Sequence, residues 1–161
     1  MKIYTKKGDL GKTDLIKERV LKTDLRIEVN GVVDELNAYL CLAKLEITDQ
    51  TITNLIDKIK ETLRSVGFEI AANKTLIKKT DVEFLEAKID QFEEKLLPLS
   101  SFIEFDQNKA AAIVNIARTV TRRAERLIVR LHLEKKLNQN LLKYFNRLSD
   151  LLFVVARLLQ E

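Results

Sequence analysis

The chain is poor in residues that interrupt helices and in residues that bind metals or form disulfides. Its 161 residues include four glycines, one proline, one cysteine, one histidine and no tryptophan. A single cysteine, Cys41, excludes an intramolecular disulfide and a cysteine-based zinc site. Cys41 follows an apolar helical stretch, so we expect it to pack in the core. His132 lies near the end of a predicted helix, where a surface position is expected rather than a catalytic role.

Long apolar segments are missing as well. No stretch reaches the length of a transmembrane helix, and the N-terminus has no signal-peptide pattern. We therefore expect a cytoplasmic protein with no membrane partner. The net charge of +4 is compatible with an anionic ligand, but it does not choose among a nucleotide, a nucleic acid and an acidic surface.

Apolar positions recur at helical spacing along most of the chain, which predicts an all-α fold. We expect one domain over residues 1–161, with an ordered N-terminal loop over residues 1–23 and five helices in an antiparallel bundle. The predicted helices cover residues 24–45, 49–73, 80–97, 108–135 and 138–159. The third is expected to open with a capping box from Thr80 to Glu83. Gly31 lies inside the first helix, where it predicts a close helix–helix crossing, and no alternation is long enough to predict a sheet.

The N-terminal loop combines features of a phosphate-binding segment. Gly8 and Gly11 would let backbone N–H groups approach an anion, and nearby lysines and threonines supply charge and hydroxyl groups. The spacing is not that of a Walker motif. Taken alone, this segment is better explained as a solvated basic terminus.

Three predicted helices carry polar stripes among apolar residues. Arg118, Arg122 and Glu125 share one face of the fourth helix, because they lie at positions i, i+4 and i+7. The same spacing relates Asn146, Asp150 and Phe153 in the fifth helix and Asn30, Asp34 and Asn37 in the first. Three such stripes in one bundle suggest a shared polar cleft, although a solvated charged face would explain the arginines alone.

Taken together, these segments resemble the cob(I)alamin adenosyltransferases of the propanediol-utilisation (PduO) type. The matching runs are YTKKGDLG (residues 4–11) with RVLK (19–22), GVVDELN (31–37), ARTVTRRAER (117–126) and NRLSDLLF (146–153). They occur in the family's order and extend over nearly the whole chain.

The resemblance implies a helical bundle that assembles as a homotrimer, with ATP bound at each subunit interface. It implies an ATP-binding loop made by Thr5, Lys6, Gly8, Asp9, Gly11 and Lys22. It further implies that Arg122, Glu125 and Asn146 hold the nucleotide and its Mg²⁺-linked triphosphate, with Glu125 the candidate ligand of the metal. Asp34 would pair with Arg118 across the interface. Phe102 and Phe153 would line the corrinoid pocket.

The implied reaction is attack of Co(I) on the ribose 5′ carbon of ATP, which yields adenosylcobalamin and triphosphate. The substrates are then ATP and a reduced corrinoid, and a corrinoid reductase is a further expected partner. The catalytic residues implied are Arg118, Arg122 and Asp34. Because the cobalt is the nucleophile, the protein needs only to align the reactants and neutralise charge.

The chain departs from the family pattern in two loops and at one helical position. A glycine pair usual after the nucleotide loop is replaced by residues 15–19, and a Pro-Gly-Gly turn is replaced by residues 102–108. Asn115 stands where a histidine is common. These changes leave open a second hypothesis, a catalytically impaired family member that binds a nucleotide or a corrinoid. A basic nucleic-acid binder is a third, disfavoured because lysines and glutamates are interspersed along the helices.

Overall fold

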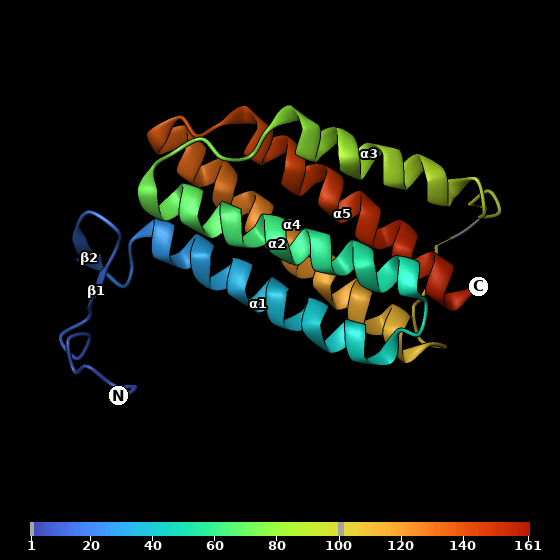
Figure 1. Ribbon diagram of the computed structural model, residues 1–161, viewed down its shortest axis with the longest axis horizontal. Coiled ribbons are helices and arrows are strands. Elements are labelled where there is room, and N and C mark those ends of the chain that lie inside the picture. Colours follow the sequence, from blue (N-terminus) through green and yellow to red (C-terminus); the bar gives the residue numbers. More distant parts are fainter. Residues whose placement is uncertain (1, 100–101) are drawn as a thin grey trace.

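The computed structural model describes residues 2–99 and 102–161, and its framework is a bundle of five helices (Figure 1). The helices are α1 (Leu25–Glu46), α2 (Gln50–Ala72), α3 (Lys79–Glu93), α4 (Lys109–Lys135) and α5 (Gln139–Gln160). Helix α4 packs against α5 and α1, while α3 packs on α5 and α2 on α1. The predicted all-α bundle is therefore confirmed.

Four of the helices begin where a side chain caps the first turn. Asp24 accepts a hydrogen bond from the Arg26 amide at 2.9 Å, and Asp49 does so from the Thr51 amide at 2.7 Å. Asn108 and Asn138 cap α4 and α5 in the same way. Each cap satisfies an N–H group that has no partner inside the helix, which explains why the polarity pattern located these starts well.

The start of α3 differs from the prediction. The helix begins at Lys79, and the amide of Lys78 donates to Asp81 Oδ2 at 2.8 Å, whereas a capping box from Thr80 to Glu83 was expected. The reason lies just upstream, where the amide of buried Ile77 donates to Glu69 at 2.7 Å and its carbonyl accepts from Asn138 at 2.7 Å. These bonds hold Ile77 in place, so the chain can turn into the helix directly after it.

The N-terminal segment contains a small β-hairpin that the sequence pattern did not predict. Strands β1 (Lys12–Asp14) and β2 (Arg19–Leu21) pair antiparallel, with Thr13 opposite Val20. The chain reverses between them through a hydrogen bond from the Leu15 amide to the Glu18 carbonyl at 2.8 Å. Strands of three residues are too short for alternation to reveal them.

One side of α1 faces solvent, and two expectations fail there. Gly31, Asp34, Ala38, Cys41 and Leu45 recur at helical spacing on this side, and all are exposed. Cys41 is therefore not a core residue. A Cβ atom added at Gly31 would meet nothing within 4 Å, so no helix of the described chain crosses closely at this glycine.

The core lies between α1, α2, α4 and α5, and α3 closes one side of it. Its largest fully buried side chains include Leu36, Ile59, Ile128 and Phe145. Burying side chains of this size contributes about 1.5–3 kcal/mol each, which fixes the relative positions of the helices. Over the residues that the structure describes, no helix is long and apolar enough to cross a membrane.

Candidate functional site

The N-terminal segment folds so that Lys22 lies over the two glycines of the predicted phosphate loop. The Lys22 amide donates to the Gly11 carbonyl at 2.9 Å, and the Gly11 amide donates to the Gly8 carbonyl at 3.1 Å. A Cβ atom at Gly8 would lie 3.1 Å from the Lys22 Nζ. Gly11 has a φ of +75°, a conformation that glycine adopts without steric cost. Glycine backbone and a lysine ammonium group therefore occupy one small region.

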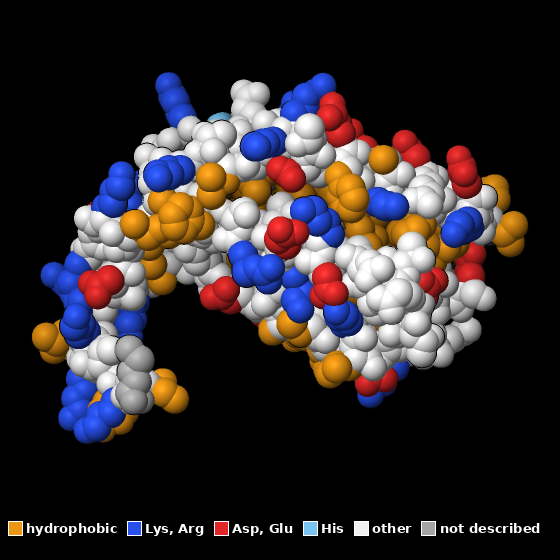
Figure 2. All heavy atoms as spheres, viewed as in Figure 1, with side chains coloured by type: hydrophobic (Ala, Val, Ile, Leu, Met, Phe, Trp, Pro, Cys, Tyr) orange, Lys and Arg blue, Asp and Glu red, His pale blue; other side chains and the backbone are white. Residues whose placement is uncertain are grey.

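The other residues predicted for this loop surround the turn. Thr5 accepts a hydrogen bond from the Lys7 amide at 3.4 Å, and the Asp9 amide donates to the Lys6 carbonyl at 3.5 Å. Lys6, with a φ of +59°, carries an exposed side chain. Figure 2 shows that the segment projects from the bundle, bears many basic side chains and leaves a hollow between itself and the bundle. A surface of this kind attracts an anion.

A buried arginine anchors this segment to the bundle. The Arg26 guanidinium donates to Glu18 at 2.5 Å and to Asp24 at 2.9 and 2.8 Å. These hydrogen bonds are the main reason that the pKa of Asp24 falls to about 2. Hydrogen bonding to the two carboxylates also raises the pKa of Arg26 above its usual value.

Polar residues of α4 and α5 meet at the surface of the bundle. The Asn146 amide donates to Glu125 at 3.1 Å and accepts from Arg147 at 2.7 Å, and Arg147 also donates to Glu86 on α3 at 2.9 Å. Glu125 and Asn146 are thus brought together, as their predicted shared role requires. Arg122 lies one turn before Glu125 with its side chain exposed.

Arg118 is half-buried at the next turn of α4. Its Nε donates to Asn115 Oδ1 at 2.9 Å, and its guanidinium carbon lies 5.8 Å from the centre of the Phe153 ring. Burial, and after it the charge of Arg122, lowers the pKa of Arg118 from its usual value. An arginine remains protonated at neutral pH, so a carboxylate partner would stabilise it.

An apolar hollow of about 520 Å³ opens beside Arg118. Phe105 and Phe153 pack edge to face in its wall, with ring centres 5.9 Å apart. Phe102 is fully exposed where the hollow meets solvent. The lining residues are Leu99, Phe102, Ile103, Phe105, Asn115, Arg118 and Phe153. Both residues predicted to contact a corrinoid, Phe102 and Phe153, belong to this set.

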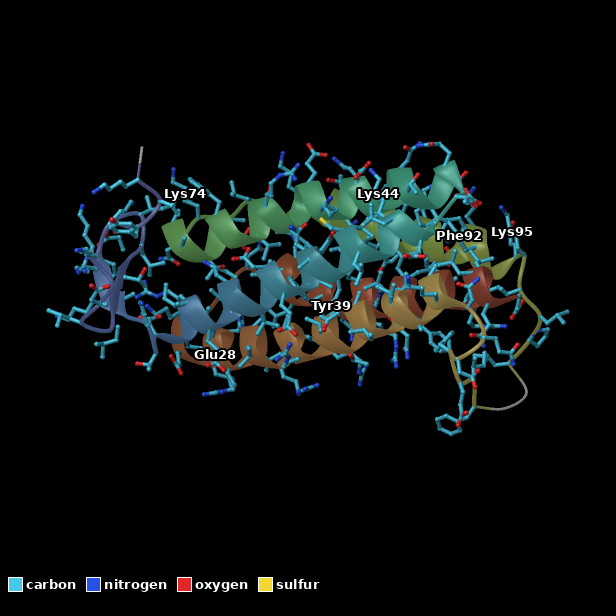
Figure 3. All side chains as sticks on the ribbon, turned by 90° about the horizontal axis from the view of Figure 1, so that it is seen from below. Glu28, Tyr39, Lys44, Lys74, Phe92 and Lys95 are labelled. Atoms are coloured by element: carbon cyan, nitrogen blue, oxygen red, sulfur yellow. The ribbon has the colours of Figure 1, made fainter. Side chains whose placement is uncertain are left out.

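The chain does not bring all the predicted site residues together. The N-terminal segment lies at one end of the bundle, whereas the hollow lies at the other, near the end marked by Phe92 and Lys95 (Figure 3). Within residues 2–99 and 102–161, no hydrogen bond or ion pair joins the N-terminal segment to α4 or α5. Asp34 is exposed and makes no ion pair with Arg118 in the described part of the chain.

The three polar stripes do not converge on one cleft of the single chain. Asn30 of α1 faces α2, since its amide lies 3.5 Å from the Gly67 carbonyl. Glu125 and Asn146 meet between α4 and α5 instead. Nor do the described residues contain three His, Cys, Asp or Glu side chains grouped to hold a metal ion. A Mg²⁺ ion near Glu125 would take most of its ligands from phosphate oxygens and water, as Mg²⁺ commonly does.

Some residues of this region were not assigned a site role from the sequence. Asn115 and Phe105 were noted only as departures from a family pattern, yet the first orients Arg118 and the second packs on Phe153. Arg157 and Gln160 contact the segment that lines the hollow. The sequence does mark Arg157 as unusual, because it is the one charged residue in the apolar run from Leu151 to Leu159.

Comparison with known proteins shows a match to one family along almost the entire chain. The family model described as cobalamin adenosyltransferase matches residues 3–159. The corrinoid adenosyltransferase of Bacillus subtilis is 39% identical over 98% of this chain and 86% of its own length. The corrinoid adenosyltransferase PduO of Salmonella typhimurium is also 39% identical over 98% of this chain, which spans 49% of that protein. A variant of a PduO-type ATP:corrinoid adenosyltransferase from Lactobacillus reuteri, complexed with cobalamin and ATP, has a TM-score of 0.88 and 36% identity over 97% of this chain and 92% of its own.

Proposed function

This chain belongs to the cobalamin adenosyltransferase family, and on that premise we propose that it transfers the 5′-deoxyadenosyl group of ATP to cob(I)alamin, with release of triphosphate. The observation that carries the proposal is the position of the apolar hollow. It lies directly beside the face of α4 that presents Arg118, Arg122 and Glu125. A large apolar ring system and a polyphosphate can therefore approach the same helix.

The transfer is a displacement at the ribose 5′ carbon. An electron pair of Co(I) forms the new cobalt–carbon bond, and the carbon–oxygen bond to the triphosphate breaks with its electron pair leaving on oxygen. The described residues of the hollow include no histidine or cysteine, and this chemistry needs none because the cobalt is the nucleophile. What remains for the protein is alignment of the reactants and stabilisation of the leaving charge.

We assign ATP binding to two groups of residues that lie apart in one chain. Thr5, Lys6, Gly8, Asp9, Gly11 and Lys22 form the phosphate-binding loop, and Arg122, Glu125 and Asn146 complete the nucleotide site. Arg122 supplies a permanent positive charge to the departing triphosphate, which is accompanied by Mg²⁺. Asn146, whose amide oxygen accepts from Arg147, donates to Glu125 Oε1, and the other oxygen of Glu125 would be the one offered to that metal.

The corrinoid occupies the apolar hollow in this proposal. Phe153 forms part of its wall and Phe102 lies at its rim, where a bound ring would cover the exposed aromatic face. Apolar side chains against the lower face of the corrinoid exclude the lower axial ligand, which makes Co(II) easier to reduce. The reduction itself requires an electron donor, so a corrinoid reductase is the expected partner.

The separation of the two groups supports assembly as a homotrimer with each active site between subunits. The solvent-facing side of α1 carries Gly31, Asp34, Ala38, Cys41 and Leu45, of which Leu45 is 81% exposed. Small residues allow a second helix to approach closely, and the exposed leucine favours burial. Asp34 on this side would then pair with Arg118 of a neighbouring subunit and give it the carboxylate partner that it lacks among the described residues.

An anaerobic assay tests the proposed reaction. The protein is mixed with ATP, Mg²⁺ and chemically reduced cob(I)alamin, the corrinoid absorbance is followed, and triphosphate is measured. The wild type should turn over, and Arg122→Ala should lower kcat by about 100-fold or more, because it removes a charge that stabilises the leaving group. Arg130→Ala, which removes another exposed arginine of α4, is the matched control and should keep wild-type kcat.

Two results would contradict the proposal. Equal activity in Arg122→Ala and the wild type would remove Arg122 from the site. A wild type that binds ATP in calorimetry but shows no turnover would favour the second hypothesis, a family member that binds its ligands without transferring the adenosyl group. The first variant to make would then replace residues 102–108 with the Pro-Gly-Gly turn that is usual in the family.

A further inference from the structure

One face of the last turns of α5 is directed toward the segment that lines the hollow. Phe153, Arg157 and Gln160 lie at positions i, i+4 and i+7, so their side chains share that face. Arg157 is 6% exposed although it is charged. Burying a charged group costs free energy unless it is hydrogen-bonded, so the hydrogen bonds of the Arg157 guanidinium indicate its structural role.

Each of these three residues contacts a different point of the lining segment. Arg157 Nη2 donates to the Leu97 carbonyl at 2.7 Å, before the hollow-lining residues begin, and also to Glu161 at 3.0 Å. Gln160 Nε2 donates to the Glu104 carbonyl at 2.6 Å, after Phe102 and Ile103. The Phe153 ring packs edge to face against the ring of Phe105.

The hydrogen bonds made by Arg157 and Gln160 therefore flank three of the residues that line the hollow. Leu99, Phe102 and Ile103 fall between the two carbonyl groups that Arg157 and Gln160 bind. These residues are not part of a helix or strand, so no regular backbone ladder fixes them. A backbone held at Glu104 leaves fewer conformations to the adjoining residues Phe102 and Ile103, which lowers the entropy that is lost when a ligand binds.

We propose that Arg157 and Gln160 are positioning residues that hold the backbone at Leu97 and at Glu104, next to residues that line the hollow, and thereby set the affinity for the corrinoid. This inference rests on the proposed function, because it takes the hollow as the corrinoid site. Neither side chain is among those that line the hollow, so they act on the ligand through the segment that they hold. Nucleotide binding is unaffected, since Asn146, the nucleotide residue on α5, lies about three turns before Arg157, and the other nucleotide residues lie on other elements.

The decisive variant is Gln160→Glu. It keeps the size of the side chain but replaces the amide donor with an acceptor, so the bond to the Glu104 carbonyl cannot form at neutral pH. We expect the KM for cob(I)alamin to rise about five-fold, the loss that one hydrogen bond commonly brings. The KM for ATP should not change, and Tm should stay within about 2 °C of the wild type. Gln139→Glu, the same substitution at the exposed first residue of α5, is the control.

Arg157 is tested by a pair of variants. Arg157→Met keeps much of the side-chain length but removes the donor, whereas Arg157→Lys keeps a positive charge and a donor near the Leu97 carbonyl. The methionine variant should raise the KM for cob(I)alamin, and the lysine variant should restore most of the affinity. A purely structural residue would not show this rescue together with an unchanged KM for ATP.

Hydrogen exchange gives a readout that needs no corrinoid. Amides of residues 102–107 should exchange faster in Gln160→Glu than in the wild type, while amides in the middle of α5 keep their protection. Unchanged exchange and an unchanged KM for cob(I)alamin would overturn the inference. So would a parallel rise in both KM values, because it would show a general disturbance. A wild type without turnover would instead remove the proposed function, so the two failures are distinguishable.

Discussion

Arg26 illustrates how one side chain can orient a whole segment. It is 8% exposed at the first turn of α1 and binds carboxylates on both sides, Asp24 at the helix cap and Glu18 in the turn of the hairpin. Because Asp24 also caps α1, the arginine links the helix start to the N-terminal segment. The hairpin therefore leaves the bundle in a defined direction, which places Lys22 and the two glycines relative to α1.

The Asp24–Arg26 pair predicts a specific loss of stability in acid. The pKa of Asp24 is lowered to about 2 in the folded protein, from 3.8 in its ordinary environment. A lowered folded-state pKa means that the stabilisation is fully present above pH 4 and is lost as the pH falls from about 4 to 2. Allowing for screening by solvent, we expect about 1 kcal/mol to be lost over this range. Denaturant unfolding at several pH values measures it.

Asp24→Asn is the informative variant for this prediction. Asparagine caps a helix about as well as aspartate, so the substitution removes the titrating charge and keeps the cap. The variant should be less stable than the wild type at neutral pH, and the difference should shrink toward pH 2. Unfolding free energies that remain parallel across the whole range would show that the pair does not contribute as described.

For single residues, the sequence predicted some side-chain contacts and missed others. Glu125 and Asn146 were expected to cooperate, and the structure joins them by a hydrogen bond. The contact between Arg118 and Phe153 was not foreseen, although the two share a pocket wall. Spacing within a helix can be read from the sequence, whereas the face of a second helix that meets it depends on the packing angle.

Among the elements, the connection between α2 and α3 depends on one buried carboxylate. Glu69, near the end of α2, is 4% exposed and accepts hydrogen bonds from the Leu76 and Ile77 amides at 2.6 and 2.7 Å. Ile77 is fully buried, so its amide has no access to water. Glu69 therefore supplies the hydrogen-bond acceptor that regular secondary structure would supply elsewhere, and it determines where α3 begins.

Removing that carboxylate should destabilise the protein without changing its chemistry. Glu69→Ala leaves two amide groups unsatisfied, and we expect about 2–4 kcal/mol of unfolding free energy to be lost. Transfer activity below the unfolding transition should stay near that of the wild type, because Glu69 lies outside both the nucleotide residues and the hollow. Chemical denaturation and the anaerobic assay check the two parts separately.

Glu61→Ala is the matched control on the same helix. Glu61 is exposed and pairs only with Lys58 at the surface, so its loss should change stability by less than about 0.5 kcal/mol. Similar losses in the two variants would contradict the special role given to Glu69. A large fall in activity in Glu69→Ala below its unfolding transition would show that the α2–α3 connection affects the site.

At the scale of the molecule, the candidate site is divided between opposite ends of the bundle. The phosphate-binding loop is at one end and the hollow is at the other, and the solvent-facing side of α1 carries Asp34 between them. In the proposed homotrimer, cyclic assembly would bring the N-terminal loop of one chain against the hollow of the next, so that each site is completed between two subunits.

Subunit mixing tests this arrangement directly. Asp34→Ala and Arg118→Ala should each lower transfer activity, since each removes one partner of the proposed intersubunit pair. When the two variants are unfolded together and reassembled, some interfaces receive Asp34 from one subunit and Arg118 from the other. Random mixing restores about a quarter of the interfaces, so activity should rise well above that of either variant alone. Sedimentation measurements verify that trimers have re-formed.

The control for this experiment is a mixture of Arg118→Ala and Arg122→Ala. Both arginines lie on α4 of the same subunit, so no mixed interface contains the two intact, and activity should not recover. Recovery in the control would show that Arg118 and Arg122 serve different sites. No recovery in the Asp34→Ala and Arg118→Ala mixture, with trimers present, would place the pair within one chain or remove it.

The sequence alone determined the helical elements of the protein and the family to which it belongs. Four helix starts were predicted because a capping side chain is a local requirement, as at Asp24, Asp49, Asn108 and Asn138. Family resemblance was carried by contiguous runs on α1, α4 and α5, which are also local, and the match along residues 3–159 confirms it. The cytoplasmic location, the trimer and the reductase partner stay predictions.

Only the tertiary structure decided which segments meet. The start of α3 depends on Asn138, which lies far from Lys79 along the chain, as well as on the nearer Glu69. The exposure of Cys41 depends on which side of α1 the other helices leave uncovered. The segment that lines the hollow is held by Arg157 and Gln160, more than fifty residues later in the sequence. Periodicity describes one helix at a time, whereas these features arise from how helices pack against one another, and that packing is a property of the whole core.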